Sequence, residues 1–160
     1  MTRRLLILPT CLYHHGYGWL LGHRFIMLTH VGRRTGRVFD TVLEVVALND
    51  RTHEVVVVAG LGRSANWYRN IHAQPPRAVM IGRERFCPIV RDLDDEEAST
   101  VLAEYEQRNR WIRPVIRVVL SRLVGWRYDG SDWARRRLVR QLPFVAFALT
   151  APGTVVHPIP

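Results

Sequence analysis

Apolar and polar positions alternate along the chain in short runs, and these runs predict six β-strands. They are residues 24–29, 38–48, 53–59, 78–81, 85–90 and 142–150. Most of the runs are rich in β-branched and aromatic side chains, and turns of glycine, asparagine or aspartate separate several of them. Because most of the connections between them are hairpin-short, we expect antiparallel pairing.

Helical spacing of apolar positions predicts four helices at the margins of these strands. They are residues 12–21, 65–73, 94–108 and 111–124. Ser64 is suited to cap the second helix, acidic residues open the third, and Pro114 lies in the first turn of the fourth. The run Arg135-Arg136-Arg137, with Arg140, is typical of a charged helix face.

Together these elements predict a small closed barrel of the α+β class, mainly β, in a single domain of residues 1–160. No internal repeat or interdomain linker is visible. Within that domain we expect an amphipathic segment at residues 1–22, a barrel core at 23–93, a helical region at 94–140 and the final strand at 142–150.

The N-terminal segment lacks formal charge between Arg4 and Arg24, but Pro9, three glycines and His14-His15 interrupt it. It therefore makes a poor membrane span and a poor signal peptide. We expect it to pack on the domain or to touch a membrane surface. Two cysteines without disulfide or zinc spacing fit a reducing cytoplasm, so the expected location is cytoplasmic and possibly membrane-associated.

The net charge of +9 comes from 23 basic residues, all of them arginine. A cationic surface favours phosphates, nucleic acid or anionic lipid, and charge alone does not choose among them. The arginine runs lack the interleaved aromatics of a nucleic-acid module, which makes nucleic acid the less expected partner.

Residues 60–65, Gly-Leu-Gly-Arg-Ser-Ala, match the glycine fingerprint of dinucleotide-binding folds. The predicted helix after them is too short for a crossover to a parallel strand, and no strand–helix alternation follows. What remains is a glycine turn that leads into a helix N-terminus, where backbone amides can bind anions or ring oxygens.

A second glycine-bounded turn, residues 32–36, has the sequence Gly-Arg-Arg-Thr-Gly. Its spacing is not that of a phosphate-binding Walker loop. Such a turn is commonly a solvated hairpin tip. Its functional interpretation is phosphate or carboxylate binding through guanidinium groups and the Thr35 hydroxyl.

Other chemistry finds little support in the sequence. The seven histidines show no metal-ligand spacing, so we assign no metal, and no nucleophile elbow or cysteine–base pair indicates a hydrolase. Trp67 and Tyr68 are as consistent with core packing as with a ligand site, and Asn70 can face either solvent or a ligand.

In combination these motifs are more specific. The motifs are Leu-Thr-His-Val-Gly-Arg-Arg-Thr-Gly-Arg, then a strand hairpin, then a glycine loop into Asn-Trp-Tyr-Arg-Asn-Ile, and then Gln-Pro-Pro before two strands. Their order along the chain closely resembles that of the deazaflavin-dependent nitroreductase family. The resemblance covers roughly residues 12–107 and the last strand. It implies a six-stranded antiparallel split β-barrel with flanking helices and, as cofactor, reduced deazaflavin coenzyme F420.

The resemblance also implies a set of cofactor-binding residues. The phosphate and acidic tail would be held by Arg33, Arg34 and Thr35. The deazaflavin ring would be lined by Thr41, Val42, Leu43, Ala59, Gly60 and Leu61, and the site would be closed by Asn66, Trp67, Tyr68 and Asn70. Many relatives have arginine where Phe39 stands, so tail binding is expected to differ.

A reduced deazaflavin delivers hydride itself, which explains the lack of a catalytic triad. The expected acceptor is a small hydrophobic quinone, nitro or enone compound, with a proton from solvent or from Tyr68 or Tyr128. Two alternatives stay open: a non-catalytic barrel that binds a cofactor or lipid, and a basic module for nucleic acid or anionic membranes. A monomer or a homodimer is expected, the latter if the barrel leaves open edges.

Overall fold

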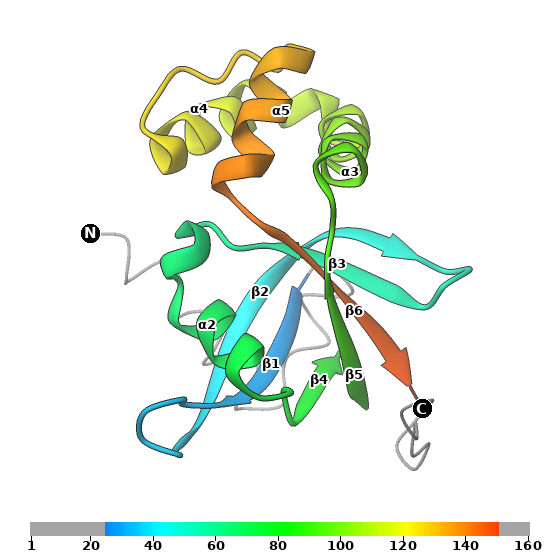
Figure 1. The fold of residues 1–160 in the computed structure, drawn as a ribbon. Coiled ribbons are helices and arrows are strands. Elements are labelled where there is room, and N and C mark those ends of the chain that lie inside the picture. Colours follow the sequence, from blue (N-terminus) through cyan, green and yellow to red (C-terminus); the bar gives the residue numbers. More distant parts are fainter. Residues whose placement is uncertain (1–24, 151–160) are drawn as a thin grey trace.

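The computed structural model describes residues 25–150, and its centre is a closed barrel of six antiparallel strands (Figure 1). The strands are β1 Phe25–Val31, β2 Val38–Asn49, β3 Glu54–Val58, β4 Ala78–Ile81, β5 Glu84–Asp92 and β6 Phe144–Thr150. Around the barrel they follow the order β1-β2-β3-β6-β5-β4. The predicted six-stranded antiparallel fold is therefore confirmed. Because β4 pairs with β1, the open edges that would have favoured a homodimer do not occur among these strands.

The strands form because apolar side chains at every second position can share one interior. Ile26 and Leu28 of β1 and Phe147 of β6 are fully buried in the same core cluster. Burial of each such side chain contributes about 1.5–3 kcal/mol relative to exposure. A slip of one residue would move the whole set to the outer surface, so the apolar pattern fixes the register in which Leu28 pairs with Thr41.

A second core lies on the outer face of β2, β3 and β6, where the helices pack. The β2–β3 pairing shifts register between Val45 and Ala47. Val46 belongs to this second cluster, together with Leu102 and Leu138 of the covering helices. The bulge thus lets one strand serve both cores.

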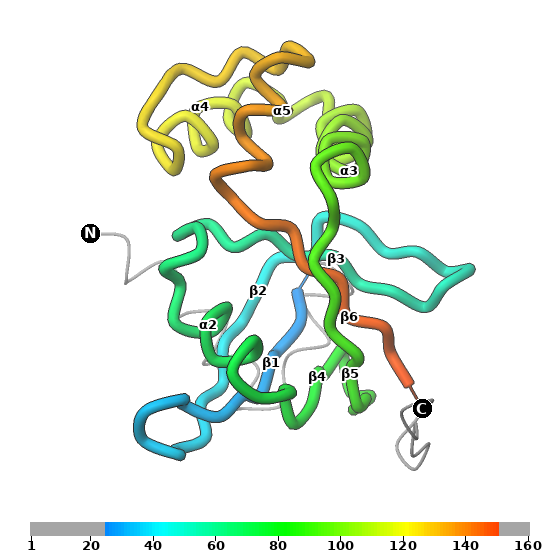
Figure 2. Tube along the Cα trace, in the orientation of Figure 1, coloured from blue at the N-terminus to red at the C-terminus, as the bar shows by residue number. Residues whose placement is uncertain are grey.

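Three helices and a short 3-10 turn make up this covering layer, which we call the helical unit. Its elements are α3 Asp95–Arg108, η3 Arg110–Ile112, α4 Arg113–Val124 and α5 Asp132–Gln141. Figure 2 shows the unit gathered at one end of the molecule, away from the turn between β1 and β2. The remaining helix, α2 Asn66–Ala73, follows the 3-10 turn η2 Gly62–Ser64 and lies against β1, where Trp67 and Ile71 join the barrel core.

Local sequence signals explain most of the helix ends. The Asp94 carboxylate accepts a hydrogen bond from the Glu97 amide and so caps α3, and Gly125 ends α4 with a left-handed φ of 77°. The prediction for Ser64 was wrong. Ala65 holds the capping position of α2, because Ser64 closes the preceding 3-10 turn by donating its hydroxyl to the Leu61 carbonyl.

Several boundaries also differ from the predicted ones. β1 continues two residues past Thr29, since its pairing with β2 extends to Val31 and Val38. The arginine run predicted as a charged helix face lies in α5. The predicted helix at 12–21, the amphipathic segment at 1–22 and the proline-rich tail lie outside the described residues. Within residues 25–150, no helix combines the length and the apolar character needed to span a bilayer.

Candidate functional site

The turn between β1 and β2 is compact because its glycines allow close approach. The Gly32 and Gly36 amides donate to the carbonyls of Arg37 and Gly32, both at 2.8 Å. A Cβ on Gly32 would lie 2.7 Å from the Phe39 ring and 2.9 Å from the Thr35 hydroxyl oxygen, so a side chain there would force the turn apart. Gly36 has a φ of 68°, which favours glycine. The sequence thus builds a tight loop that presents Arg33 and Arg34 side by side.

The loop after β3 brings a second set of polar and aromatic groups toward this turn. Gly62 has a φ of 64°, and a Cβ there would lie 3.0 Å from the Gln141 carbonyl oxygen. The chain therefore turns sharply at Gly62, which packs against the last residue of α5, and α2 begins after this turn. This turn places Asn66 and Trp67 at the N-terminal end of α2.

The two loops are joined directly by Asn70. Its Oδ1 accepts one hydrogen bond from the Arg33 backbone amide (3.1 Å) and another from Arg33 Nη1 (2.9 Å). Asn70 is buried, and its two bonds to the half-exposed Arg33 are partly shielded from water. Segments that lie 37 residues apart in the sequence thus form one site.

The same amide also reaches His30, a residue that the sequence did not single out. Asn70 Nδ2 donates to His30 Nδ1 at 3.1 Å, so the imidazole proton must lie on Nε2, which is 3.0 Å from the Thr41 hydroxyl. Burial lowers the pKa of His30, and Asp40 raises it by a smaller amount. A neutral imidazole therefore forms part of the wall of the site.

A cleft of about 430 Å³ lies between the two loops. Its lining comprises His30, Gly32, Arg33, Arg34, Thr35, Phe39, Asp40, Thr41, Leu61, Ala65, Asn66, Trp67 and Asn70. Guanidinium groups occupy the side formed by the β1–β2 turn, and Trp67 and Leu61 come from the opposite loop. Phe39 stacks on His30 with ring centroids 5.9 Å apart.

The electrostatics of the cleft favour an anionic ligand. Desolvation, and then the positive charges of Arg69 and Arg34, lower the pKa of Arg33. The arginine remains charged, but its neighbours repel it. A bound phosphate or carboxylate would relieve this repulsion and accept guanidinium hydrogen bonds.

Eight of the thirteen predicted cofactor residues line this cleft, and the other five do not. Thr41 and Leu61 line it. By contrast, Val42 packs with Met27 in a separate cluster, and Leu43 and Ala59 are buried in the barrel core. Gly60 lies next to Leu123 of α4.

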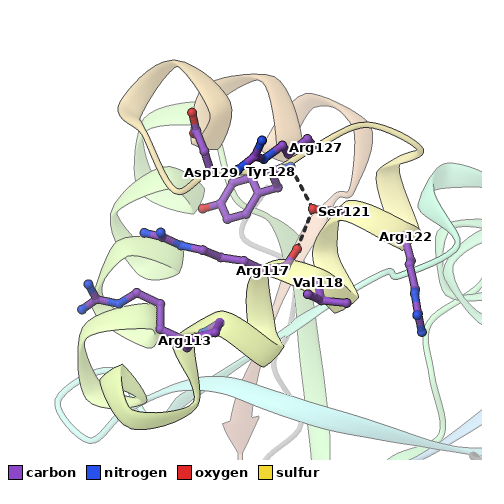
Figure 3. A pocket seen from close by; sticks show the side chains of 9 residues that line it. Arg113, Arg117, Val118, Ser121, Arg122, Arg127, Tyr128 and Asp129 are labelled. Carbon is purple, nitrogen blue, oxygen red and sulfur yellow. Dashed lines mark hydrogen bonds between the residues drawn. The ribbon is translucent and has the colours of Figure 1, made fainter.

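The two tyrosines predicted as proton donors lie outside the lining of the cleft. The Tyr68 hydroxyl donates to Asp92 Oδ2 at 2.7 Å, and burial followed by this hydrogen bond raises the pKa of Tyr68 to about 12. Tyr128 lies beside a cavity in the helical unit (Figure 3) and donates to Glu106 at 3.0 Å. Burial and the Glu106 charge raise its pKa further still.

Sequence reasoning missed His30 and Asp40 among the lining residues. The available signal was position: His30 falls on the inward-facing alternation of β1, one place before the strand ends, where a polar residue needs a partner. Asp40 accepts a hydrogen bond from Thr29 on the neighbouring strand at 2.7 Å. Across the described part of the chain, no cluster of three or more metal-binding side chains occurs.

Known proteins resemble this chain in sequence and in structure. The sequence model of the F420H(2)-dependent quinone reductase family matches residues 14–120. A protein of Mycobacterium tuberculosis, named "Putative F420H(2)-dependent quinone reductase Rv3178", is 31% identical over 93 residues, which cover 56% of this chain and 68% of that protein.

Two solved structures are similar in fold. An F420-H2 dependent reductase, FDR-A, is 18% identical with a TM-score of 0.44, covering 79% of this chain and 95% of that one. The protein Atu2129 of Agrobacterium tumefaciens, described as of unknown function, is 11% identical with a TM-score of 0.50. The match covers 79% of this chain and 48% of Atu2129.

Proposed function

This chain belongs to the F420H(2)-dependent quinone reductase family and is thus an F420-dependent oxidoreductase, and we propose that its cleft is where reduced coenzyme F420 passes hydride to a small hydrophobic acceptor. A quinone fits this proposal best, with nitro and enone compounds as further acceptors. The single observation that carries the proposal is the joining of the arginine turn to α2 through Asn70, which makes one cleft with a cationic side and an aromatic side.

The residues of the cleft fit the coenzyme in chemical character. The coenzyme has a planar ring and an anionic portion made of a phosphate and an acidic tail. Arg33, Arg34 and Thr35 offer charged and hydroxyl donors to that portion. Trp67 and Leu61 offer apolar surface to a ring. Phe39, in place of the arginine of many relatives, packs on His30 and adds aromatic rather than cationic surface on its side of the cleft.

Bound reduced coenzyme F420 supplies the hydride, so the protein has to bind, orient and exclude water. Asn70 holds Arg33 in place, and His30 holds Asn70. Trp67, which is almost fully buried, forms a fixed apolar wall. For the proton that completes the reduction we propose solvent as the source, because the Tyr68 hydroxyl is already donated to Asp92.

The test is a titration of tryptophan fluorescence with oxidised and reduced coenzyme F420 in wild type, Arg34→Ala and Arg37→Ala. Both arginines belong to the same exposed segment, but Arg34 lines the cleft and Arg37 does not. Loss of a charge-assisted contact in Arg34→Ala should weaken binding roughly 10- to 100-fold. Arg37→Ala is expected to bind like wild type.

The titration is followed by turnover with a quinone, a nitro compound and an enone. Tight binding of flavin mononucleotide without any binding of coenzyme F420 would reject the proposal. Binding of the coenzyme without reduction of any acceptor would favour the non-catalytic barrel instead. Equal dissociation constants for the two arginine variants would mean that the anionic tail lies elsewhere.

A further inference from the structure

One basic segment of the helical unit is also strongly apolar. Residues 110–127 contain five arginines and no aspartate or glutamate, and most of their other side chains are aliphatic or tryptophan. α4 forms the greater part of this segment. An amphipathic sequence of this kind is typical of helices that lie on membrane surfaces or bind acidic partners.

α4 presents apolar side chains on two sides, and only one of them is covered. Ile116, Leu120 and Val124 are buried against the rest of the helical unit. A second set, spaced three or four residues apart, remains exposed, with Trp111 85% and Val115 62% accessible. We call this set the α4 surface; it consists of Trp111, Ile112, Val115, Val118, Val119 and Leu123. Six exposed apolar side chains on α4 and the 3-10 turn before it indicate an interaction site.

Four arginines are among the residues that line a cavity of about 470 Å³ beside α4. In Figure 3 the side chains of Arg113 and Arg117 extend to one side of α4, and that of Arg122 extends to the other side. Arg122 and Arg127 make no ion pair with any other residue between 25 and 150. The lining includes a single acidic residue, Asp129.

We propose that the α4 surface docks on a bilayer that contains anionic phospholipid. The aliphatic side chains would enter the boundary between headgroups and acyl chains, and Arg122 and Arg127, which form no ion pair within residues 25–150, would contact lipid phosphates. Exposed Trp111, with the Arg110 guanidinium 5.2 Å above its ring, has the amphipathic character that is enriched at this boundary. The surface consists of residues of η3 and α4 alone.

The positive charge beside the α4 surface favours a membrane over a second copy of the chain as the binding partner. A symmetric pair that met through the α4 surface would bring arginines of both copies together, and like charges at an interface are costly. An anionic bilayer instead supplies the opposite charge along the whole helix. An acidic protein would also supply negative charge, and vesicle binding distinguishes a bilayer from such a protein.

The α4 surface is continuous with the cleft through one contact. Leu123 Cδ1 lies 3.6 Å from the position of a Cβ on Gly60, and the next residue, Leu61, lines the cleft while 70% exposed. A hydrophobic acceptor that leaves the bilayer at this point would meet the mouth of the cleft first. This last step rests on the proposed function, whereas docking itself does not.

Docking is tested by sedimentation of the full-length chain with vesicles of phosphatidylcholine alone or mixed with phosphatidylglycerol. Wild type should bind the mixed vesicles and lose binding as salt is raised. Val115→Asp with Val119→Asp places two charges on the α4 surface and should weaken vesicle binding roughly tenfold or more. Leu48→Asp with Ile89→Asp, which charges two residues exposed on the barrel, is the matched control and should bind like wild type.

Each other outcome overturns the proposal. Wild type that ignores mixed vesicles, or α4 variants that bind as wild type does, would rule out docking through this surface. Concentration-dependent dimers that the α4 variants abolish would assign the surface to a second copy, and binding to an acidic protein without vesicle binding would assign it to that class. Coenzyme titrations on the same variants keep the two proposals apart, since failure of docking should leave coenzyme affinity unchanged.

Discussion

Two polar networks, each built around a buried side chain, lie in different parts of the molecule, and the central group of one is neutral while that of the other is charged. The cleft network consists of Arg33, Asn70, His30 and Thr41. The helical network consists of Glu106, Tyr128, Arg135 and Arg117. At the centre of the first is a neutral amide, and at the centre of the second is a carboxylate that is only 2% exposed.

The difference shows that burial and a shifted pKa do not by themselves mark a functional site. The pKa of Tyr128 is raised more than that of Tyr68, yet the Tyr128 hydroxyl donates to Glu106 within the helical unit. The pKa values in the cleft network are less strongly shifted, but this network joins two loops around a ligand-sized space. Geometry therefore separates the roles: the network around Glu106 holds helices together, and the network around Asn70 holds the arginine turn beside the cleft.

The strongest way to separate the two networks is to remove the helical carboxylate. Glu106→Ala leaves Arg135 and the Tyr128 hydroxyl without their buried partner and should lower the free energy of unfolding by about 3 kcal/mol. Urea denaturation measures this loss. Glu97→Ala, on the same helix, is the control, because its pair with Arg91 is exposed and should cost no more than about 1 kcal/mol.

Coenzyme binding by the folded fraction of Glu106→Ala should stay as in wild type. A large loss of affinity would show that the helical network also shapes the cleft. Equal destabilisation by Glu106→Ala and Glu97→Ala would mean that burial of the carboxylate contributes little.

The corresponding change in the cleft network is Asn70→Ala. It removes the acceptor of both Arg33 hydrogen bonds and the donor to His30, so the arginine turn loses its anchor. Coenzyme affinity should fall roughly tenfold, with a smaller loss of stability than in Glu106→Ala. Fluorescence titration measures the affinity. Gln74→Ala, at the exposed end of the same helix, should have no effect, and an Asn70→Ala protein with unchanged affinity would contradict the role of the anchor.

The smallest expected effect is on the pH dependence of stability. Burial lowers the pKa of His30 below its ordinary value of 6.5, so the unfolded chain binds more protons between the two values. Stability should thus fall as the pH drops from 6.5 toward the lowered pKa, and should be fully present above 6.5. Denaturation curves at several pH values should show this slope in wild type and lack it in His30→Gln.

His53→Asn provides the control for the pH experiment. His53 is exposed in the β2–β3 turn with a φ of 50°, a conformation that asparagine accepts. This variant should keep the slope of wild type. The same slope in His30→Gln would assign the titration to another group.

The sequence predicted the barrel well because alternation of apolar residues is a local signal. Each strand reports its own inward face, as β1 does with Ile26 and Leu28, and short turns leave antiparallel pairing as the only simple connection. The two loops of the site were also predicted, since glycine turns with arginine or tryptophan are visible within a few residues.

Features that depend on contacts distant in sequence could not be predicted in the same way. The hydrogen bond between His30 and Asn70 spans 40 residues, and the sequence around His30 contains no signal that identifies its partner. Whether Tyr68 faces the cleft or Asp92 depends on the side of α2 that meets β5. The exposure of Val115 and the burial of Ile116 likewise depend on which face of α4 packs on the helical unit.

The Asn70 side chain accepts hydrogen bonds from both the main chain and the side chain of Arg33. These hydrogen bonds restrict the conformations of the arginine turn in the unliganded protein. A ligand that binds such a preorganised loop loses less entropy in ordering it, so more of each new contact is expressed as affinity. We therefore expect the Asn70 amide to raise the affinity of the proposed site even without a direct contact to the ligand.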